Sequence, residues 1–204
     1  MHINIKIKKD LCEFFLILIA FCVFFLPSAA GIETLTYCDS QKISTEGGNH
    51  TLPLFDPNLG DLVGVKMTAN LDVLQNFSLE NDLQEAQTMS AESDVGLIIA
   101  APDSSSISVN ASSSINENLD PFDGQMDFSG ASGRTIEEKR TTGSAEMDFE
   151  NLAGFVASVQ NETISLPVSI SIGSSSTGNC VFGMTTLTQS ELCVVYSYEP
   201  KAVA

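Results

Sequence analysis

Apolar and polar residues alternate strictly along residues 63–73 of the chain. One face receives Val63, Val65, Met67, Ala69, Leu71 and Val73, and the other receives Gly64, Lys66, Thr68, Asn70 and Asp72. A period of two predicts an extended strand with one buried face. The alternation fails at Leu74 and Gln75, where an apolar and a polar residue exchange places. We therefore expect a bend or bulge that divides residues 63–79 into two strands or passes the chain between sheets.

Several later segments repeat this period and are separated by turn residues. They cover residues 107–115, 145–149, 164–172, 181–187 and 192–198. Residues 83–93 fit either a helix or a strand, because Leu-Gln-Glu-Ala-Gln has helical propensity. About eight to ten strands and no long helix predict an all-β fold, an antiparallel β-sandwich or jelly roll.

The N-terminus has the layout of a secretory signal peptide. Lys6, Lys8 and Lys9 precede an apolar run over residues 14–26, and Pro27-Ser28-Ala29-Ala30 supplies small residues for cleavage before Gly31. We expect a signal peptide helix over residues 1–30 and a single β domain over residues 31–204. An uncleaved signal that tethers the chain to a membrane is the alternative, and it is the only membrane contact we expect.

Composition limits the partners of this domain. The chain has 26 acidic and 9 basic residues, a net charge of −17. Such a surface repels nucleic acid and anionic lipid. The predicted domain keeps three cysteines, Cys38, Cys180 and Cys193, so we expect one disulfide and one free thiol outside the cell. Their spacing does not select the pair, and no CxxC motif indicates zinc or redox chemistry.

Five blocks of the sequence carry a resemblance to a known family. They are LPLFDPNLGDL at 52–62, FSLEN at 77–81, PFDGQMDFSGASG at 121–133, LAGF at 152–155, and LPVS at 166–169 with a final VVYSY at 194–198. The chain resembles a choice-of-anchor E domain, an exported prokaryotic domain that precedes various cell-surface sorting signals. The resemblance covers nearly all of residues 31–204, and the first and third blocks are its most specific parts.

This resemblance implies a secreted or cell-surface β domain with no catalytic residues to carry over. Members often continue into a C-terminal anchor, but no such tail is detected after Tyr198. The expected function is therefore an exported, non-enzymatic structural or adhesive domain, either released outside the cell or held at the surface. Surface-layer proteins, other cell-surface proteins or glycans are the expected partners. The alternative is a calcium- or glycan-binding extracellular module.

Residues that could carry chemistry are few. His50 lies in a Gly-rich stretch, where we expect a solvated loop residue rather than a catalytic base or zinc ligand. No carboxylate pair is singled out for hydrolysis, so an enzyme and a resident cofactor are not expected.

Calcium is the one metal that the sequence suggests. Asp120, Asp123 and Asp127 gather oxygen ligands around Gly124, although Asp and Asn also favour turns for backbone reasons. The spacing does not match an EF-hand loop.

Sugar binding and glycosylation complete the candidates. Sugar-binding platforms are usually aromatic, but the chain has no Trp, and we expect Tyr196 and Tyr198 to pack in the core. Four sequons are candidate glycosylation sites, at Asn49, Asn76, Asn110 and Asn161.

Overall fold

The computed structural model describes residues 31–201, and the predicted signal peptide lies outside this range. Contacts within the chain divide it into Met1–Gly31 and Ile32–Ala204. The second unit contains every element discussed below. No helix within residues 31–201 is long and apolar enough to cross a membrane.

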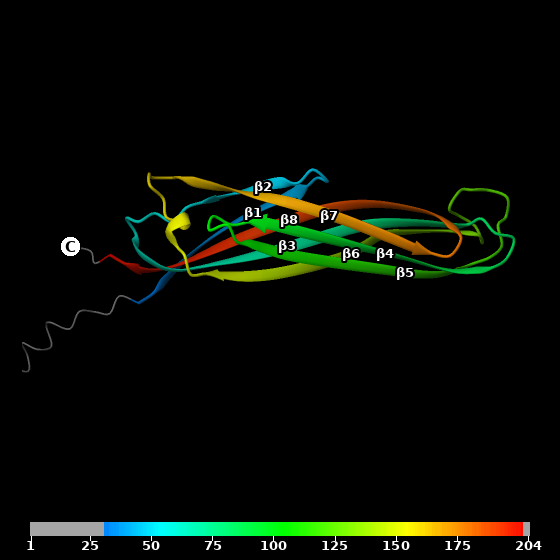
Figure 1. Ribbon diagram of the computed structural model, residues 1–204, viewed down its shortest axis with the longest axis horizontal. Helices are drawn as coiled ribbons and strands as arrows, with labels where there is room; N and C mark the ends of the chain where they lie inside the picture. The colour runs from blue at the N-terminus through cyan, green and yellow to red at the C-terminus, as the bar shows by residue number, and fades with distance from the viewer. Residues whose placement is uncertain (1–30, 202–204) are drawn as a thin grey trace, which may run out of the picture. The chain divides into compact units, whose positions relative to one another are not determined.

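Eight antiparallel strands form two four-stranded sheets (Figure 1). The first sheet has the order β1 (Glu33–Ile43), β8 (Cys180–Pro200), β3 (Gly60–Asn81) and β6 (Gly133–Phe149), and the second has the order β2 (Gly48–Pro53), β7 (Thr163–Thr177), β4 (Gln87–Ala100) and β5 (Ser106–Leu119). Apart from β4 and β5, which are neighbours in the second sheet, successive strands alternate between the sheets, and the strand orders are those of an eight-stranded jelly roll. The predicted antiparallel β-sandwich or jelly roll is confirmed.

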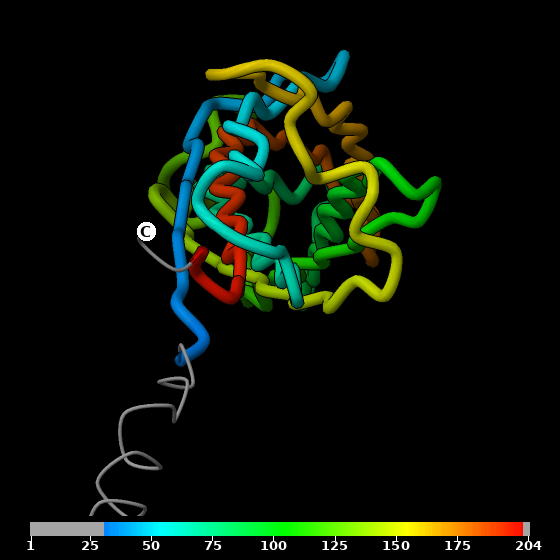
Figure 2. The backbone as a smooth tube through the Cα atoms, turned by 90° about the vertical axis from the view of Figure 1, so that its left-hand side faces the viewer, coloured from blue at the N-terminus to red at the C-terminus, as the bar shows by residue number. Residues whose placement is uncertain are grey.

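The sheets enclose two separate apolar clusters. The large core lies between the parts of the sheets that include β1 and β2, and contains Val65, Met67, Leu71, Leu97, Leu166, Leu192 and Val194 among others. The small core lies beyond them and contains Phe77, Leu79, Met89, Ala91, Ile115 and Leu119. Figure 2 looks along the strands and shows the chain arranged around this interior. Both cores follow from the period of two, because alternate residues of each strand point inward.

β3 corrects two expectations. It is one continuous strand of 22 residues, so the predicted division at Leu74 and Gln75 is wrong. Gln75 keeps the inward register and is buried, and the only irregularity nearby lies in its pairing with β6, which inserts an extra residue there. The second error is Val63, which is exposed because β3 bulges between Leu62 and Gly64 and turns its side chain outward.

The ambiguous residues 83–93 contain no helix. Residues 82–86 form a bend and β4 begins at Gln87. Asn81 explains this start, because its side-chain amide donates to the carbonyls of Glu85 and Asp120 at 2.8 and 2.7 Å, and its Oδ1 accepts from Leu83 N at 3.0 Å. A buried amide therefore fixes the turn where helical propensity would have predicted a helix.

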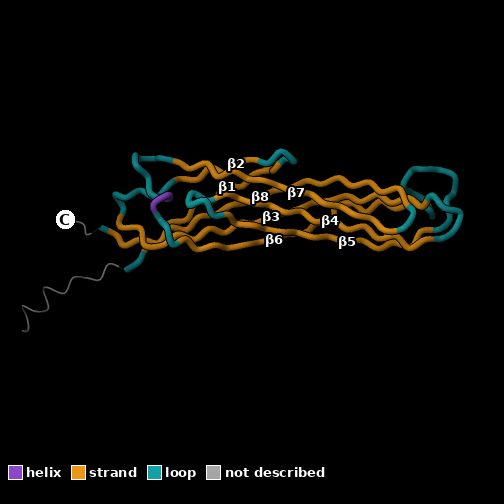
Figure 3. Tube along the Cα trace, in the orientation of Figure 1, coloured by secondary structure: helices purple, strands orange, loops and turns teal. Residues whose placement is uncertain are grey.

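Apart from LPVS at 166–169, which lies within β7, the sequence blocks behind the family resemblance lie at or next to the two ends of the sandwich, where the loops are (Figure 3). At one end, Phe55 of the first block exchanges backbone hydrogen bonds with Phe155 and Ala157, and its ring lies 5.8 Å from that of Tyr196. The Tyr196 hydroxyl donates to the Pro53 carbonyl at 2.9 Å. Burial raises the pKa of this hydroxyl. These residues close the end of the large core.

At the other end, Glu80 of the second block lies under the loop made by residues 120–132. Its Oε2 accepts from Phe128 N at 2.7 Å. Gly133 follows this loop, and a Cβ on it would lie 2.3 Å from both Glu80 Oε2 and Ser129 N. The glycine is therefore required by close packing. The first and third blocks, which are the most specific parts of the resemblance, therefore form contacts that close the two ends of the sandwich.

Candidate functional site

Three side chains form a polar chain between the two sheets, in which His50 and Ser190 are buried and Asp39 is partly exposed. His50 on β2 lies between Asp39 on β1 and Ser190 on β8. Its Nδ1 is 3.1 Å from Asp39 Oδ2, and its Nε2 is 2.9 Å from Ser190 Oγ. Asp39 Oδ2 also accepts from Thr51 N at 3.0 Å. With Nδ1–H donating to the carboxylate, Nε2 accepts from the Ser190 hydroxyl.

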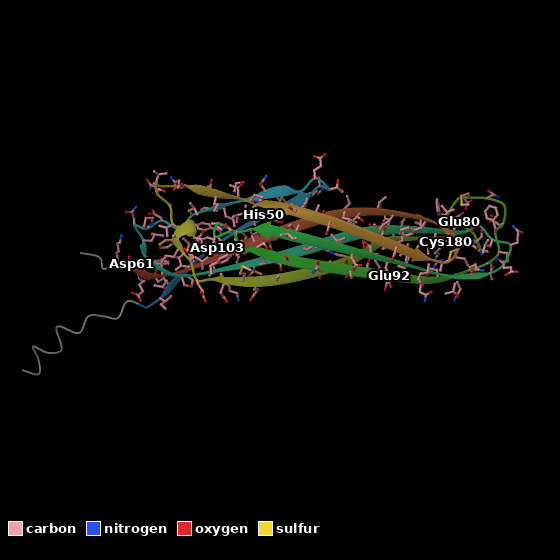
Figure 4. All side chains as sticks on the ribbon, in the orientation of Figure 1. His50, Asp61, Glu80, Glu92, Asp103 and Cys180 are labelled. Carbon is pink, nitrogen blue, oxygen red and sulfur yellow. A yellow bond between two sulfur atoms is a disulfide. The ribbon has the colours of Figure 1, made fainter. Side chains whose placement is uncertain are left out.

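His50 is the main correction to the sequence analysis. It was predicted as a solvated loop residue, but its relative exposure is 0%, and it belongs to β2, opposite Leu166 of β7. The period of two carries His50 inward together with Leu52, while Asn49 and Thr51 stay exposed. Figure 4 labels His50 within the sandwich, midway along β2.

The order serine–histidine–aspartate is that of a hydrolase triad. A nucleophile must, however, reach a substrate, and both Ser190 and His50 have no exposed surface. The two grooves on the surface described below are lined by neither residue. In this geometry the three side chains satisfy one another's hydrogen bonds and join both edge strands, β1 and β2, to β8.

A second polar layer separates the two cores. Gln75 Nε2 donates to Ser93 Oγ at 2.6 Å, and Gln75 Oε1 accepts from Ser113 Oγ at 2.6 Å. The same amide reaches Thr186 Oγ1 at 3.3 Å. The layer therefore takes residues from β3, β4, β5 and β8, and it explains why a glutamine occupies an inward position in β3.

The predicted calcium residues do not come together. Asp123 and Asp127 accept from backbone amides two residues ahead, Gln125 N and Ser129 N, both at 2.9 Å, which is the turn chemistry named as the alternative. Asp120 is exposed and joins the loop through its backbone, which donates to Ala131 O. No three His, Cys, Asp or Glu side chains within residues 31–201 lie close enough to hold a metal ion. The three carboxylates therefore form no cluster in this structure, and calcium binding at these residues stays a prediction.

Glu80 was not singled out from the sequence, although its carboxylate is fully buried. Its Oε1 and the nearby Ser132 Oγ have no hydrogen-bond partner among residues 31–201. The sequence gives no clear sign of this burial. Glu80 follows Leu79 in the alternating pattern, which predicts an outward and solvated side chain at position 80. The loop over residues 120–132 covers it instead.

The cysteines divide as one pair and one free thiol. Cys38 of β1 and Cys193 of β8 are directly opposed, with Cα atoms 4.1 Å apart, and form a disulfide. Cys180, at the start of β8, is free and partly exposed. Figure 4 labels it at the same end as Glu80. The pairing follows from the strand register, which the sequence does not supply.

All four glycosylation candidates are exposed. Asn49 and Asn110 lie on strands β2 and β5, and Asn161 lies in the turn before β7. Asn76, on the outer face of β3, accepts from Glu138 N through its Oδ1 at 2.8 Å. Surface position permits modification at each of them, while the Asn76 side chain already has a structural hydrogen bond.

The outer face of the first sheet contains a polar groove of about 610 Å³. Two rungs of directly opposed residues cross it, Ser40–Glu191–Asn70–Ser144 and Lys42–Gln189–Asp72–Thr142. Within these rungs Asn70 Nδ2 donates to Glu191 Oε2 at 3.2 Å and Gln189 Nε2 donates to Ser40 Oγ at 3.1 Å. Arg140 donates to Asp72 from beside the second rung, with an Nε–Oδ1 distance of 2.7 Å, which lowers the pKa of the Asp72 carboxyl. The groove offers hydroxyl, amide and charged groups and no aromatic platform.

Comparison with known proteins adds no function. The chain matches no protein-family model and no curated protein. Among solved structures it is similar to Desmodium yellow mottle tymovirus, with 11% identity over 87% of this chain and 94% of that chain and a TM-score of 0.21. It is also similar to turnip yellow mosaic virus, with 9% identity over 85% and 98% and a TM-score of 0.19. The infectious bursal disease virus VP2 subviral particle follows, with 11% identity over 84% and 42% and a TM-score of 0.13. Likenesses this low support no inference about activity.

Proposed function

We propose that this chain is an exported, non-catalytic domain with a structural or adhesive role at or near a cell surface. The observation that carries the proposal is the disulfide between Cys38 and Cys193 on the outer face of the first sheet. Disulfides persist in oxidising compartments and are rare in the cytosol. The signal peptide predicted over residues 1–30 would deliver the chain to such a compartment.

The disulfide also suits a domain that works outside the cell. It fastens β1, an edge strand, to the central strand β8 across 155 residues of sequence. In the chain-entropy model, closing a loop of this length stabilises a fold by about 5 kcal/mol. Edge strands are the parts of a sheet most exposed to detachment and to foreign pairing. A covalent tie at this edge supports a role that depends on durability.

Export is tested by counting thiols. Alkylation of the native protein, isolated after export, is expected to modify one cysteine, Cys180, and alkylation after reduction is expected to modify two more. A Cys38→Ser/Cys193→Ser variant is the control and gains none on reduction. A reporter phosphatase that folds only when oxidised, fused after residue 40, is expected to be active. An inactive fusion, or three thiols in the native protein, would overturn the proposal.

The non-catalytic part is supported by the burial of Ser190 and His50, which leaves no surface of either residue for a substrate to reach. A fluorophosphonate probe, which labels activated serines, tests it. We expect no labelling of the native protein and no difference between it and a Ser190→Ala variant. Labelling that disappears in Ser190→Ala would identify a working nucleophile and reject this part of the proposal.

Glycan binding is the second candidate, favoured by the polar groove across β1, β8, β3 and β6. Its hydroxyl and amide groups match the hydrogen-bonding groups of a neutral polysaccharide. Affinity electrophoresis in a gel that contains a neutral glucan tests this candidate. We expect retardation of the parent and weaker retardation of Asn70→Ala/Thr142→Val, while Asn110→Ala on the second sheet is the matched control. Equal mobility of all three in the presence and absence of glucan would reject it.

A further inference from the structure

Both sheets lose their outer strand halfway along the sandwich. β1 pairs with β8 only as far as Ile43 and Thr188, and residues 180–187 of β8 pair with β3 alone. β2 pairs with β7 only as far as Gly48 and Val168, and residues 169–177 of β7 pair with β4 alone. Figure 1 shows β1 and β2 stopping while β7 and β8 continue. Within residues 31–201, these two stretches form an open side.

The opposite side of the sandwich is closed. On this side β5 and β6, which belong to different sheets, pack against each other, whereas β7 and β8 on the open side hardly touch each other. Gly143 of β6 approaches Asn110 of β5 so closely that a Cβ would lie 2.3 Å from the Asn110 carbonyl oxygen. Lys139 Nζ also donates to Ser114 O at 3.1 Å. The two sheets can therefore close against each other at a side, and the open side results from the early ends of β1 and β2.

The open strand edges lack the devices that keep edges apart. Natural edges carry charges, prolines or bulges. Residues 163–190 contain no charged residue, and no uncharged stretch of the chain is longer than these 28 residues. Residues 169–177 and 180–187 contain no proline, and neither stretch shows a register shift with its neighbour.

The side chains of β8 favour pairing at its edge over that of β7. Leu187 is 69% exposed and Val181 is 37% exposed, whereas residues 173–177 of β7 are only Gly, Ser and Thr. A groove of about 460 Å³ begins where β1 ends, lined by Ile43, Leu74, Ile172, Thr186 and Leu187 among others. A strand placed in line with β1 would enter it.

The backbone direction of this edge follows from the disulfide pair. Directly opposed residues 4.1 Å apart at Cα form a non-hydrogen-bonded pair, so the N–H and C=O of Cys193 point to β3 and those of its neighbours point to β1. The β3–β8 register is unbroken from Gly64 to Asn81. Alternation therefore turns the N–H and C=O of Phe182, Met184 and Thr186 to the open side.

We propose that a second copy of this chain pairs with residues 181–187 of β8 across a two-fold axis. Antiparallel pairing centred on Met184 joins the two four-stranded sheets into one, with about six main-chain hydrogen bonds. This register sets Val181 of one copy opposite Leu187 of the other, twice, and covers both exposed apolar side chains.

Charge selects a second copy as the occupant. Two chains that each carry a net charge of −17 repel at most surfaces, and only an uncharged edge lets them meet without opposing carboxylates. A basic partner would gain no electrostatic attraction from this edge, because residues 163–190 contain no charged residue. The two Cys180 residues lie at opposite ends of the shared ladder, about 26 Å apart at 3.3 Å per residue, so the dimer does not depend on a disulfide between them.

Sedimentation of the full chain in a Cys180→Ser background tests the proposal. We expect a concentration-dependent dimer, which in this background cannot depend on a disulfide through Cys180. Val181→Lys/Leu187→Lys puts lysines opposite each other and is expected to weaken dimerisation by roughly tenfold or more. Both residues are exposed, so the fold is retained. Ile98→Lys, which charges an exposed apolar residue on β4, is the control and keeps the parent affinity.

Charge exchange makes the test specific for the register. Val181→Glu/Leu187→Glu is also expected to be monomeric, and an equal mixture of the Lys and Glu variants is expected to restore a dimer. Hydrogen exchange supplies an independent readout, because the amides of Phe182, Met184 and Thr186 are protected in the dimer and exchange fast in the Lys variant. A parent that stays monomeric, or a dimer that the Lys variant leaves intact, would overturn the proposal.

Discussion

The half of the sandwich that contains β1 and β2 differs from the half beyond them in how its edges are covered. In the first half each sheet has four strands, and a disulfide and the Asp39–His50–Ser190 chain hold the edge strands in place. In the second half each sheet has three strands, and the edges of β7 and β8 are open. The Gln75 layer marks the border between them. The same alternating pattern therefore occurs in one half whose edge strands are held in place and in another half whose strand edges are unpaired.

The sharpest way to test this contrast is to truncate one buried leucine in each half of β3. Leu71 lies in the large core and Leu79 in the small core, and both are essentially fully buried. We expect Leu71→Ala to lower the free energy of unfolding by about 3–5 kcal/mol and Leu79→Ala by about 2–3 kcal/mol, because open edges let the second site collapse into the cavity. Urea unfolding in the Val181→Lys/Leu187→Lys background measures both without a contribution from dimers. Equal losses would mean that the two halves are equally rigid.

The buried histidine of the first half gives the next largest effect. His50→Leu removes the partner of the Ser190 hydroxyl and one partner of Asp39, so we expect a loss of about 2–3 kcal/mol in the free energy of unfolding. Ser190→Ala alone is expected to cost about 1–2 kcal/mol. The double variant is expected to cost less than the sum, since the two side chains share one hydrogen bond. A His50→Leu variant as stable as the parent would mean that the hydrogen bonds of the ring to Asp39 and Ser190 make no net contribution to stability.

The polar layer at the border is expected to have a smaller effect. Gln75→Leu leaves Ser93 and Ser113 without their shared partner and is expected to lower the free energy of unfolding by about 1–3 kcal/mol. Adding Ser93→Ala and Ser113→Ala removes the orphaned hydroxyls and is expected to recover most of the loss, because an apolar layer then joins the two cores. Thermal unfolding of the parent, of Gln75→Leu and of the triple variant measures this. If the triple variant is no more stable than Gln75→Leu, the layer does not act through these hydrogen bonds.

The fold was predictable because its evidence is local. A period of two in β3, β5 and β7 identifies strands whatever they pair with, and glycines and prolines mark the turns between them. The irregularity predicted at Gln75 is present as a bulge in the pairing with β6, but the predicted division of the strand was wrong. The sequence could not show why a glutamine stays in the apolar register, because Ser93 and Ser113 become its partners only after the second sheet is placed.

The candidate site was largely hidden for the same reason. His50 alternates with Leu52, a signal that the neighbouring Gly47 and Gly48 obscured. Ser190, 140 positions away, meets His50 only because β2 and β8 face each other in different sheets. The choice of Cys193 over Cys180 as the partner of Cys38 depends on the β1–β8 register. The open edge depends on unequal strand lengths, and sequence patterns define strand ends less well than strand centres.

The smallest effect lies on the surface at the border, where Arg140 of β6 pairs with Asp72 of β3. The hydrogen bonds from Arg140 hold the pKa of the Asp72 carboxyl below its ordinary value. A carboxyl whose pKa is lowered by folding stabilises the fold above its unfolded pKa, near 3.9, and loses this contribution as the pH falls through the folded value. We therefore expect Arg140→Gln to lower the melting temperature slightly at neutral pH and to match the parent once Asp72 is protonated. Added salt is expected to shrink the neutral-pH difference, since both side chains are partly exposed. A difference that persists in acid would mean that Arg140 acts through packing rather than through its charge.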